Sequence, residues 1–137
     1  MSHLDILMAC QNKDVTLFKK LLHEDVVMTI TGYNNYNFTG DYNDVVEVLN
    51  AEFKDDYHAE FEVFNQVERD SENVIFIKVS REQINSGDKD NAVWVLTCDK
   101  NKTEHYLRKI HVEVVEMDQR HFEVLEEIQT GNDEMHF

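Results

Sequence analysis

The spacing of the apolar residues changes near Tyr57, and this change limits the possible folds more than any other feature of the sequence. Before Tyr57 apolar residues mostly recur every three or four positions, as they do in amphipathic helices. From there to Glu68 apolar residues that include Val63 and Val67 alternate with polar ones, which predicts a strand with these apolar residues on its buried face and the polar ones on a wet face. Three more strand-like stretches follow, near residues 74–84, 92–99 and 104–116. Helices followed by a run of antiparallel strands predict an α+β domain.

Three helices are predicted in the first part of the chain. The first covers about residues 2–13, the second begins after Asp14, and the third begins after Asp41. An aspartate just before a helix accepts hydrogen bonds from the free amide groups of the first turn. Asp44 stands three positions after Asp41, which is the spacing of a capping box. Ser2, with Asp5 three positions later, is the expected cap of the first helix, so all three helices have a defined starting point in the sequence.

One strand and one loop are predicted between the second and third helices. Residues 26–31 (VVMTIT) are mostly β-branched, which favours a strand. Residues 32–39 (GYNNYNFT) predict a polar and aromatic loop. The length of the chain fits one domain, so we expect a single domain over residues 1–137. Its core is expected at about 3–117, followed by an acidic extension at 118–137.

The charge of the chain is strongly negative, with 28 acidic and 13 basic residues and a net charge of −15. Such a field repels phosphate backbones and anionic membrane surfaces, so we expect no nucleic-acid or membrane binding. No apolar run reaches the ~20 residues that span a bilayer, and the first residues do not resemble a signal peptide. We therefore expect a cytoplasmic protein. A basic protein partner is compatible with the charge.

Cys10 and Cys98 are the only cysteines. Neither belongs to a CxxC pair or to a pattern of metal ligands, and both stand among apolar residues. We expect two buried free thiols, because disulfides are rare in the cytoplasm. A disulfide between them remains the alternative.

Two segments of the sequence resemble the nuclear transport factor 2-like superfamily. Residues 14–27 (DVTLFKKLLHEDVV) resemble its second helix and first strand. Residues 38–41 (FTGD), followed by Val45, Val46 and Leu49, resemble its aromatic-x-Gly turn into the third helix. The order and spacing of these segments match the superfamily over most of the expected core.

The resemblance implies a cone-shaped, curved antiparallel sheet packed on three N-terminal helices, with an apolar pocket at its open end. The superfamily includes ketosteroid isomerases, polyketide cyclases, limonene epoxide hydrolases, dehydratases and dimeric adaptor domains. The resemblance therefore implies a fold and a pocket, and it leaves the activity open.

The catalytic positions of the isomerase branch of the superfamily align with three residues of this chain. Its general base falls on Ile30, its oxyanion-hole tyrosine on Ile6 and its neutral aspartic acid near Trp94. Ile30 and Ile6 can neither take a proton nor donate a hydrogen bond to an enolate, so we expect no isomerisation of this kind. The same alignment implies that the three side chains point into the cone. By parity, Ile110, Val112 and Val114 line it from the last strand.

The expected pocket also includes the loop before the third helix. In the superfamily this loop closes over the mouth of the cone, and its aromatic and amide groups suit an apolar ligand with a polar tip. A plain turn-forming loop is the alternative. The expected ligand-binding residues are Ile6, Cys10, Ile30, Tyr33, Tyr36, Phe38, Trp94, Ile110 and Val112. No catalytic residue is assigned, and we expect no cofactor.

The histidines and nearby acids do not predict a metal site. His58, Glu60 and Glu62 share one face of a strand, and carboxylates at this spacing are able to bind a hard cation. That face is opposite the apolar one, so we expect it to be solvated. His105 and His111 stand six residues apart on one strand, ~20 Å along it, which is too far for a shared metal.

Arginines flanked by acids are the remaining polar candidates. In the epoxide hydrolase branch an Asp-Arg-Asp arrangement orients a water molecule. Asp99 and Arg108 match one aspartate and the arginine of such an arrangement here, but no second inward aspartate aligns with them. Arg81 lies near the end of another strand.

Three functions remain open from the sequence. The first is a homodimeric pocket protein that binds a small apolar molecule or a protein partner. The second is an enzyme of the polyketide-cyclase-like or hydrolase-like kind, with Tyr33, Tyr36 or Arg108 as candidate groups. The third is an acidic interaction protein whose outer sheet face binds a basic partner.

Overall fold

The computed structural model describes residues 3–32, 35, 37–54, 56–116 and 126–129. The helices are α1 (His3–Gln11), α2 (Val15–Leu21) and α3 (Tyr42–Lys54). The strands are β1 (Leu22–Gly32), β2 (Asn37–Gly40), β3 (Tyr57–Glu68), β4 (Glu72–Gln83), β5 (Lys89–Asp99) and β6 (Leu107–Glu116). A short helical turn covers residues 126–129.

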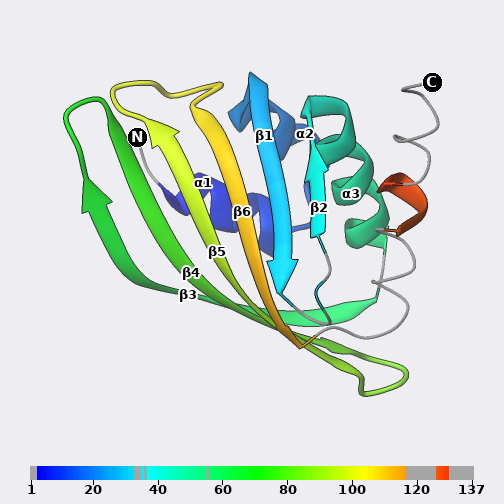
Figure 1. Cartoon of the computed structure of the whole chain (residues 1–137). Helices are drawn as coiled ribbons and strands as arrows, with labels where there is room; N and C mark the ends of the chain where they lie inside the picture. Colours follow the sequence, from blue (N-terminus) through cyan, green and yellow to red (C-terminus); the bar gives the residue numbers. More distant parts are fainter. Residues whose placement is uncertain (1–2, 33–34, 36, 55, 117–125, 130–137) are drawn as a thin grey trace.

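The described strands form one sheet in the order β2-β1-β6-β5-β4-β3, and the helices lie against one of its faces (Figure 1). This arrangement confirms the predicted α+β class. The sheet differs from the expectation in two respects. It is mixed, because β1 and β6 pair in parallel while all other neighbours are antiparallel. It is also not strongly curled. Because no tight turn joins β1 to β6, the sequence pattern carries no signal for the direction of their pairing.

The predicted helix starts are confirmed for α2 and α3. The amide of Leu17 donates a hydrogen bond to Oδ1 of Asp14 at 3.0 Å. At α3 the amide of Asp41 donates to Oδ2 of Asp44 at 2.9 Å, and the amide of Asp44 donates to Oδ1 of Asp41 at 3.2 Å. These two bonds form a capping box, which satisfies backbone donors that the helix itself leaves unpaired.

The loop expected at residues 32–39 is shorter in the structure, because Asn37–Gly40 forms β2. Its first and last residues, Asn37 and Gly40, are disfavoured in strands, so the pairing with β1 depends on the tertiary context. Gly40 packs tightly here. A Cβ at this position would lie 2.6 Å from Cβ of Asp44 and 3.0 Å from the ring of Phe38. The close approach explains why the turn into α3 carries a glycine.

The alternation of β3 is confirmed only in its first half. From Tyr57 to Val63 every second residue is less exposed, as predicted. A bulge then interrupts the pairing with β4, so Val63 faces Ile77 but Asn65 faces Phe76. A bulge reverses which side chains point inward. The prediction that Val67 faces the core is therefore wrong, and this side chain is 39% exposed.

The core lies between the helices and the inner face of the sheet. Its largest fully buried side chains include Tyr106, Phe38 and Ile6. Cys10 and Cys98 are buried free thiols, as predicted. Burial raises the pKa of each thiol to about 12. No helix in the described ranges has the length and apolar character needed to cross a membrane.

Candidate functional site

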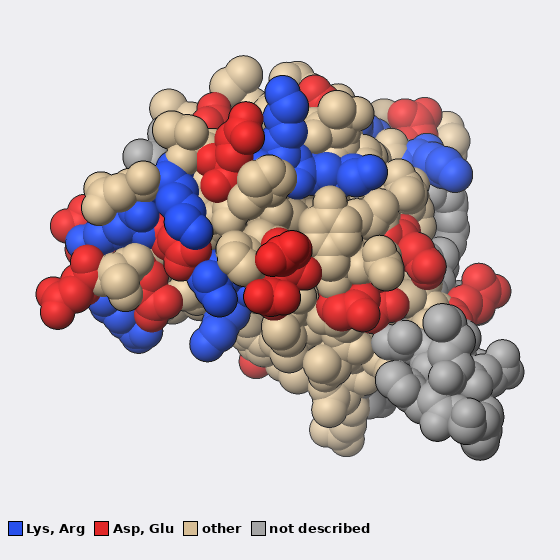
Figure 2. All heavy atoms as spheres, turned by 90° about the horizontal axis from the view of Figure 1, so that it is seen from above, with Lys and Arg blue, Asp and Glu red and all other residues tan. Residues whose placement is uncertain are grey.

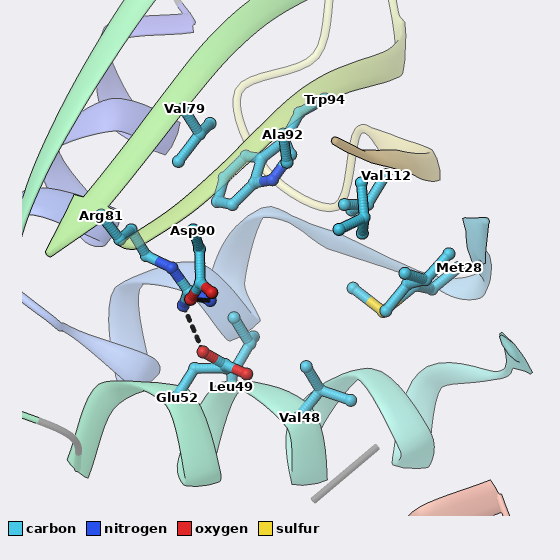
Figure 3. A pocket seen from close by; sticks show the side chains of 12 residues that line it. Met28, Val48, Leu49, Glu52, Val79, Arg81, Asp90, Ala92, Trp94 and Val112 are labelled. Atoms are coloured by element: carbon cyan, nitrogen blue, oxygen red, sulfur yellow. Dashed lines mark hydrogen bonds and ion pairs between the residues drawn. The ribbon is translucent and has the colours of Figure 1, made fainter. Parts of the chain in front are cut away.

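A pocket of about 100 Å³ lies between α3 and the inner face of the sheet (Figure 3). Most of its wall is apolar and comes from Met28, Ile30, Val48, Leu49, Val79, Ala92, Trp94, Val112 and Val114. Three charged residues, Glu52, Arg81 and Asp90, complete the lining. The volume is larger than a single water requires, and it is close to that of an engineered apolar cavity that holds benzene, roughly 150 Å³.

The sheet supplies its part of the wall through pairing register. Trp94 on β5 pairs with Ile77 on β4 and with Val112 on β6, and Val112 pairs with Ile30 on β1. Directly paired residues point to the same face, so these side chains form one inward row across four strands. The ring of Trp94 also packs against that of Phe61, with the ring centroids 5.7 Å apart.

The charged residues form a triad centred on Arg81. Its Nη2 donates to Oδ2 of Asp90 at 2.8 Å, and the two residues are paired in register on β4 and β5. Its Nη1 donates to Oε2 of Glu52, which comes from the last turn of α3. The side chains of Arg81, Glu52 and Asp90 are only 16%, 13% and 9% exposed. The triad therefore joins the helix to the sheet at one side of the pocket.

The carboxylates keep Arg81 charged despite its burial. Burial by itself lowers the pKa of a guanidinium, but Glu52 and Asp90 raise the pKa of Arg81 above its usual range. Buried charges are costly unless they are paired and hydrogen-bonded, and here each charged group has a partner. The site therefore holds one guanidinium between two carboxyl groups.

Tyr57 lies next to the triad and connects it to the turn between α1 and α2. Its ring centroid is 5.1 Å from Cζ of Arg81 and 4.2 Å from Nζ of Lys13. Both distances fit cation–π contacts. Burial raises the pKa of Tyr57 to about 12, although the nearby Arg81 lowers it in part. The phenol therefore remains protonated at neutral pH.

The structure places the nine expected ligand-binding residues in three groups. Ile30, Trp94 and Val112 line the pocket. Ile6, Cys10, Phe38 and Ile110 are buried in the core and do not line it. Tyr33 and Tyr36 lie outside the described residues. Whether any of these residues contacts a ligand remains a prediction.

The other polar candidates lie away from the pocket. His58 and Glu60 are 74% and 79% exposed at the side chain, with Nε2 of His58 3.9 Å from Oε1 of Glu60. Arg108 lies 3.4 Å from Asp99. None of these four residues lines the pocket between α3 and the sheet.

His105 and His111 make separate local contacts. Nδ1 of His105 is 3.0 Å from the carbonyl oxygen of Leu22. Nδ1 of His111 is 2.7 Å from the hydroxyl of Thr29. The two histidines therefore do not share a site.

Sequence reasoning missed Glu52 and Asp90. Glu52 stands three residues after Leu49 and seven after Val45, so it lies on the apolar stripe of α3. An acidic residue on an apolar stripe indicates a charge that points toward the core, so the sequence did carry a signal for Glu52. Asp90 gave no comparable signal, because it precedes the stretch where a strand was expected. The inward direction of Arg81 follows from its parity with Val79.

Helices packed on one face of a mostly antiparallel sheet, with a pocket between the two layers, define a class of α+β proteins. Comparison with solved structures identifies the fold of this chain. A conserved protein from Planctomyces limnophilus is similar at TM-score 0.64 and 12% identity, over 84% of this chain and 91% of that one. A ketosteroid isomerase-like protein from Erwinia carotovora atroseptica is similar at TM-score 0.58 and 11% identity, over 83% and 91%. A nuclear transport factor 2-like protein from Cytophaga hutchinsonii is similar at TM-score 0.60 and 11% identity, over 82% and 92%.

This chain therefore has the nuclear transport factor 2-like fold. No family model matches its sequence, and no curated protein matches it either. At identities of 11–12% the likeness extends to the fold and not to a ligand or an activity.

Proposed function

We propose that this protein binds a small, mostly apolar molecule that carries one polar group. The observation that supports this function is the apolar pocket that ends at a buried Glu52–Arg81–Asp90 triad. Apolar walls provide affinity by removing ligand surface from water, at about 25 cal/mol per Å². Convergent polar groups at one end fix the orientation of a ligand. The volume of about 100 Å³ limits the buried part of the ligand to roughly one small ring.

Trp94 provides a direct test, because it is the single tryptophan of the chain and lines the pocket. We expect one-ring probes such as benzyl alcohol to change its fluorescence in a saturable way. Replacing Ala92 by Leu adds volume to the lining and should abolish the change. Val93→Leu is the matched control, because Val93 is the next residue on β5 and points to the opposite face. Equal binding to both variants would contradict the proposed site.

Hydrolysis is a second candidate function, and the triad is the observation that favours it. A carboxylate beside a guanidinium is able to hold a water molecule and accept its proton as the oxygen attacks an epoxide carbon. The second acid, in its protonated form, would then donate to the leaving oxygen as the carbon–oxygen bond breaks. The product is a diol, and the reaction consumes one water.

The hydrolase candidate is tested with a small epoxide such as styrene oxide, by following diol formation by chromatography. Turnover that scales with protein and falls at least about 100-fold in Glu52→Gln or Asp90→Asn would support it. A rate equal to that of buffer would remove this candidate and leave the binding function in place.

A further inference from the structure

The charged side chains of the pocket are engaged within the protein. Arg81 donates to Glu52 and to Asp90, and its guanidinium also lies over the ring of Tyr57. Glu52 and Asp90 take part in further interactions beyond these two hydrogen bonds. The triad therefore gives the pocket a fixed polar end, and none of its members depends on a ligand for a partner.

The other polar side-chain atom of the lining is the indole nitrogen of Trp94. An indole N–H donates a hydrogen bond and accepts none. Within the ranges that the structure describes, no residue accepts a hydrogen bond from this nitrogen. It is not among the fully buried polar atoms that lack a partner, so it keeps accessible surface. In Figure 3 it lies on the edge of the ring that faces the cavity.

The surroundings of Trp94 are apolar. Its direct neighbours in the sheet are Ile77 on β4 and Val112 on β6, and its ring packs against that of Phe61. These side chains contain no acceptor for the indole N–H. A polar group in an apolar wall costs free energy unless it meets a hydrogen-bond partner. A ligand that brings an acceptor to this point of the pocket therefore gains affinity and a fixed orientation.

We propose that the ligand carries an uncharged acceptor oxygen, as in a ketone, an ester or a cyclic ether, and that Nε1 of Trp94 donates a hydrogen bond to it. This inference rests on the proposed binding function of the pocket. An alcohol also brings a donor, which the apolar side chains around Trp94 cannot accept. A carboxylate that leaves water needs a cation, and Arg81 is already held by two acids. One net hydrogen bond corresponds to roughly 3-fold to 10-fold in affinity.

Two probes of nearly the same shape test the hydrogen bond: cyclohexanone, and methylenecyclohexane, in which a CH₂ group replaces the oxygen. Trp94 is the single tryptophan, so the ¹⁵N-labelled protein has one indole N–H signal in its NMR spectrum. Neither probe is aromatic, so neither shifts this signal by a ring current. Cyclohexanone should move the indole proton downfield in a saturable way, and methylenecyclohexane should bind without this shift.

The outcomes separate the inference from the binding function. If both probes bind and the indole proton responds to them alike, the inference fails while the binding function stands. If neither probe binds, the proposed binding function fails and the inference fails with it. Cyclohexanecarboxylate is the third probe, and binding as tight as that of cyclohexanone would overturn the preference for an uncharged acceptor.

Trp94→Phe keeps an aromatic ring and removes the donor. Ligand-observed NMR should show that this variant loses roughly 3-fold to 10-fold more affinity for cyclohexanone than for methylenecyclohexane. Val112→Ala is the matched control, because Val112 lines the same wall beside Trp94 and its replacement removes no polar atom. It should weaken both probes equally. Equal losses in Trp94→Phe as well would overturn the inference. The indole signal needs no substitution, so it decides the question if Trp94→Phe does not fold by circular dichroism.

Discussion

Glu52 and Arg81 form an ion pair that connects the last turn of α3 to β4 beside the pocket. The two residues are 29 positions apart in sequence, and both side chains are mostly buried. The guanidinium also binds Asp90, so a single side chain holds a helix and two strands together. The stability of this region and the shape of the pocket therefore depend on the same contact.

Replacing Arg81 by Met should destabilise the protein strongly. The change leaves two buried acids without their cation, and losing one partner of a buried ion pair typically costs about 3–5 kcal/mol. Urea denaturation followed by circular dichroism measures the change in the free energy of unfolding. Arg69→Met is the matched control, because Arg69 pairs with Glu72 at 2.9 Å while its side chain is 61% exposed. That surface pair should contribute less than about 1 kcal/mol. Similar losses in the two variants would contradict a structural role for the triad.

The buried thiols and Tyr57 should make the protein less stable in alkali. The ordinary pKa values are 9.0 for a thiol and 10.0 for a tyrosine, and folding raises those of Cys10 and Tyr57 to about 12. Between pH 9 and 12 the folded state therefore keeps protons that the unfolded state has released. Stability is fully present below pH 9 and declines as pH rises through this window.

Thermal melts from pH 8 to pH 11 test this decline, and Cys10→Ala should weaken the pH dependence. A thiol reagent at pH 8 gives an independent measurement. Cys10 and Cys98 should react slowly in the folded protein and quickly in urea. Rapid labelling of the folded protein would show that the thiols are accessible.

The outer face of the sheet should form a homodimer. Val27, Phe64 and Val115 are 45%, 51% and 67% exposed, and Phe64 packs its ring against Phe76 at 6.1 Å. Exposed apolar groups on one face favour association with a second copy. Light scattering at micromolar concentration should give about twice the mass of the chain. Phe64→Glu should reduce the measured mass to that of a single chain. Ile84→Glu is the control and should leave the mass unchanged, because Ile84 is 62% exposed and lies beyond the end of β4. A monomer before any substitution would contradict the prediction.

Isomerisation of a 3-oxo-Δ5 steroid should not exceed the rate in buffer. Ile6, Ile30 and Trp94 stand where the isomerase branch has its base and its two donors, and each such donor contributes on the order of 10²–10³ in rate. The pocket volume of about 100 Å³ is also below the roughly 300–1,000 Å³ of most ligand sites. Absorbance of the conjugated product follows the reaction. Turnover that survives dialysis and scales with protein would mean that Glu52 or Asp90 acts as a base.

Local features of the fold were predictable because they depend on neighbouring residues. Asp14, Asp41 and Asp44 act on amides within three positions, so their roles are encoded in short sequence segments. The bulge in β3 is different. It depends on how this strand pairs with β4, and the sequence marks it only by the adjacent apolar residues Val63 and Phe64, which interrupt the alternation.

The candidate site was harder to predict than the fold because its polar residues meet only after folding. Glu52 and Arg81 come from a helix and a strand, and no periodic pattern connects them. The resemblance to the superfamily implied that Ile30 and Trp94 point inward, strand parity added Val112, and all three residues line the pocket. The charged end of the pocket depends on the placement of α3 relative to β4 and β5.

The parallel pairing of β1 with β6 also has a consequence for the order in which the molecule folds. β1 lies between β2 and β6, and its register with β6 joins residues about 82 positions apart, such as Ile30 and Val112. Contacts between distant segments close slowly, because a long loop must first lose its conformational entropy. During synthesis β1 leaves the ribosome long before β6 has been made. The edge of β1 that pairs with β6 therefore stays unpaired until then. The pocket, which takes side chains from both strands, is therefore completed only after β6 has been made.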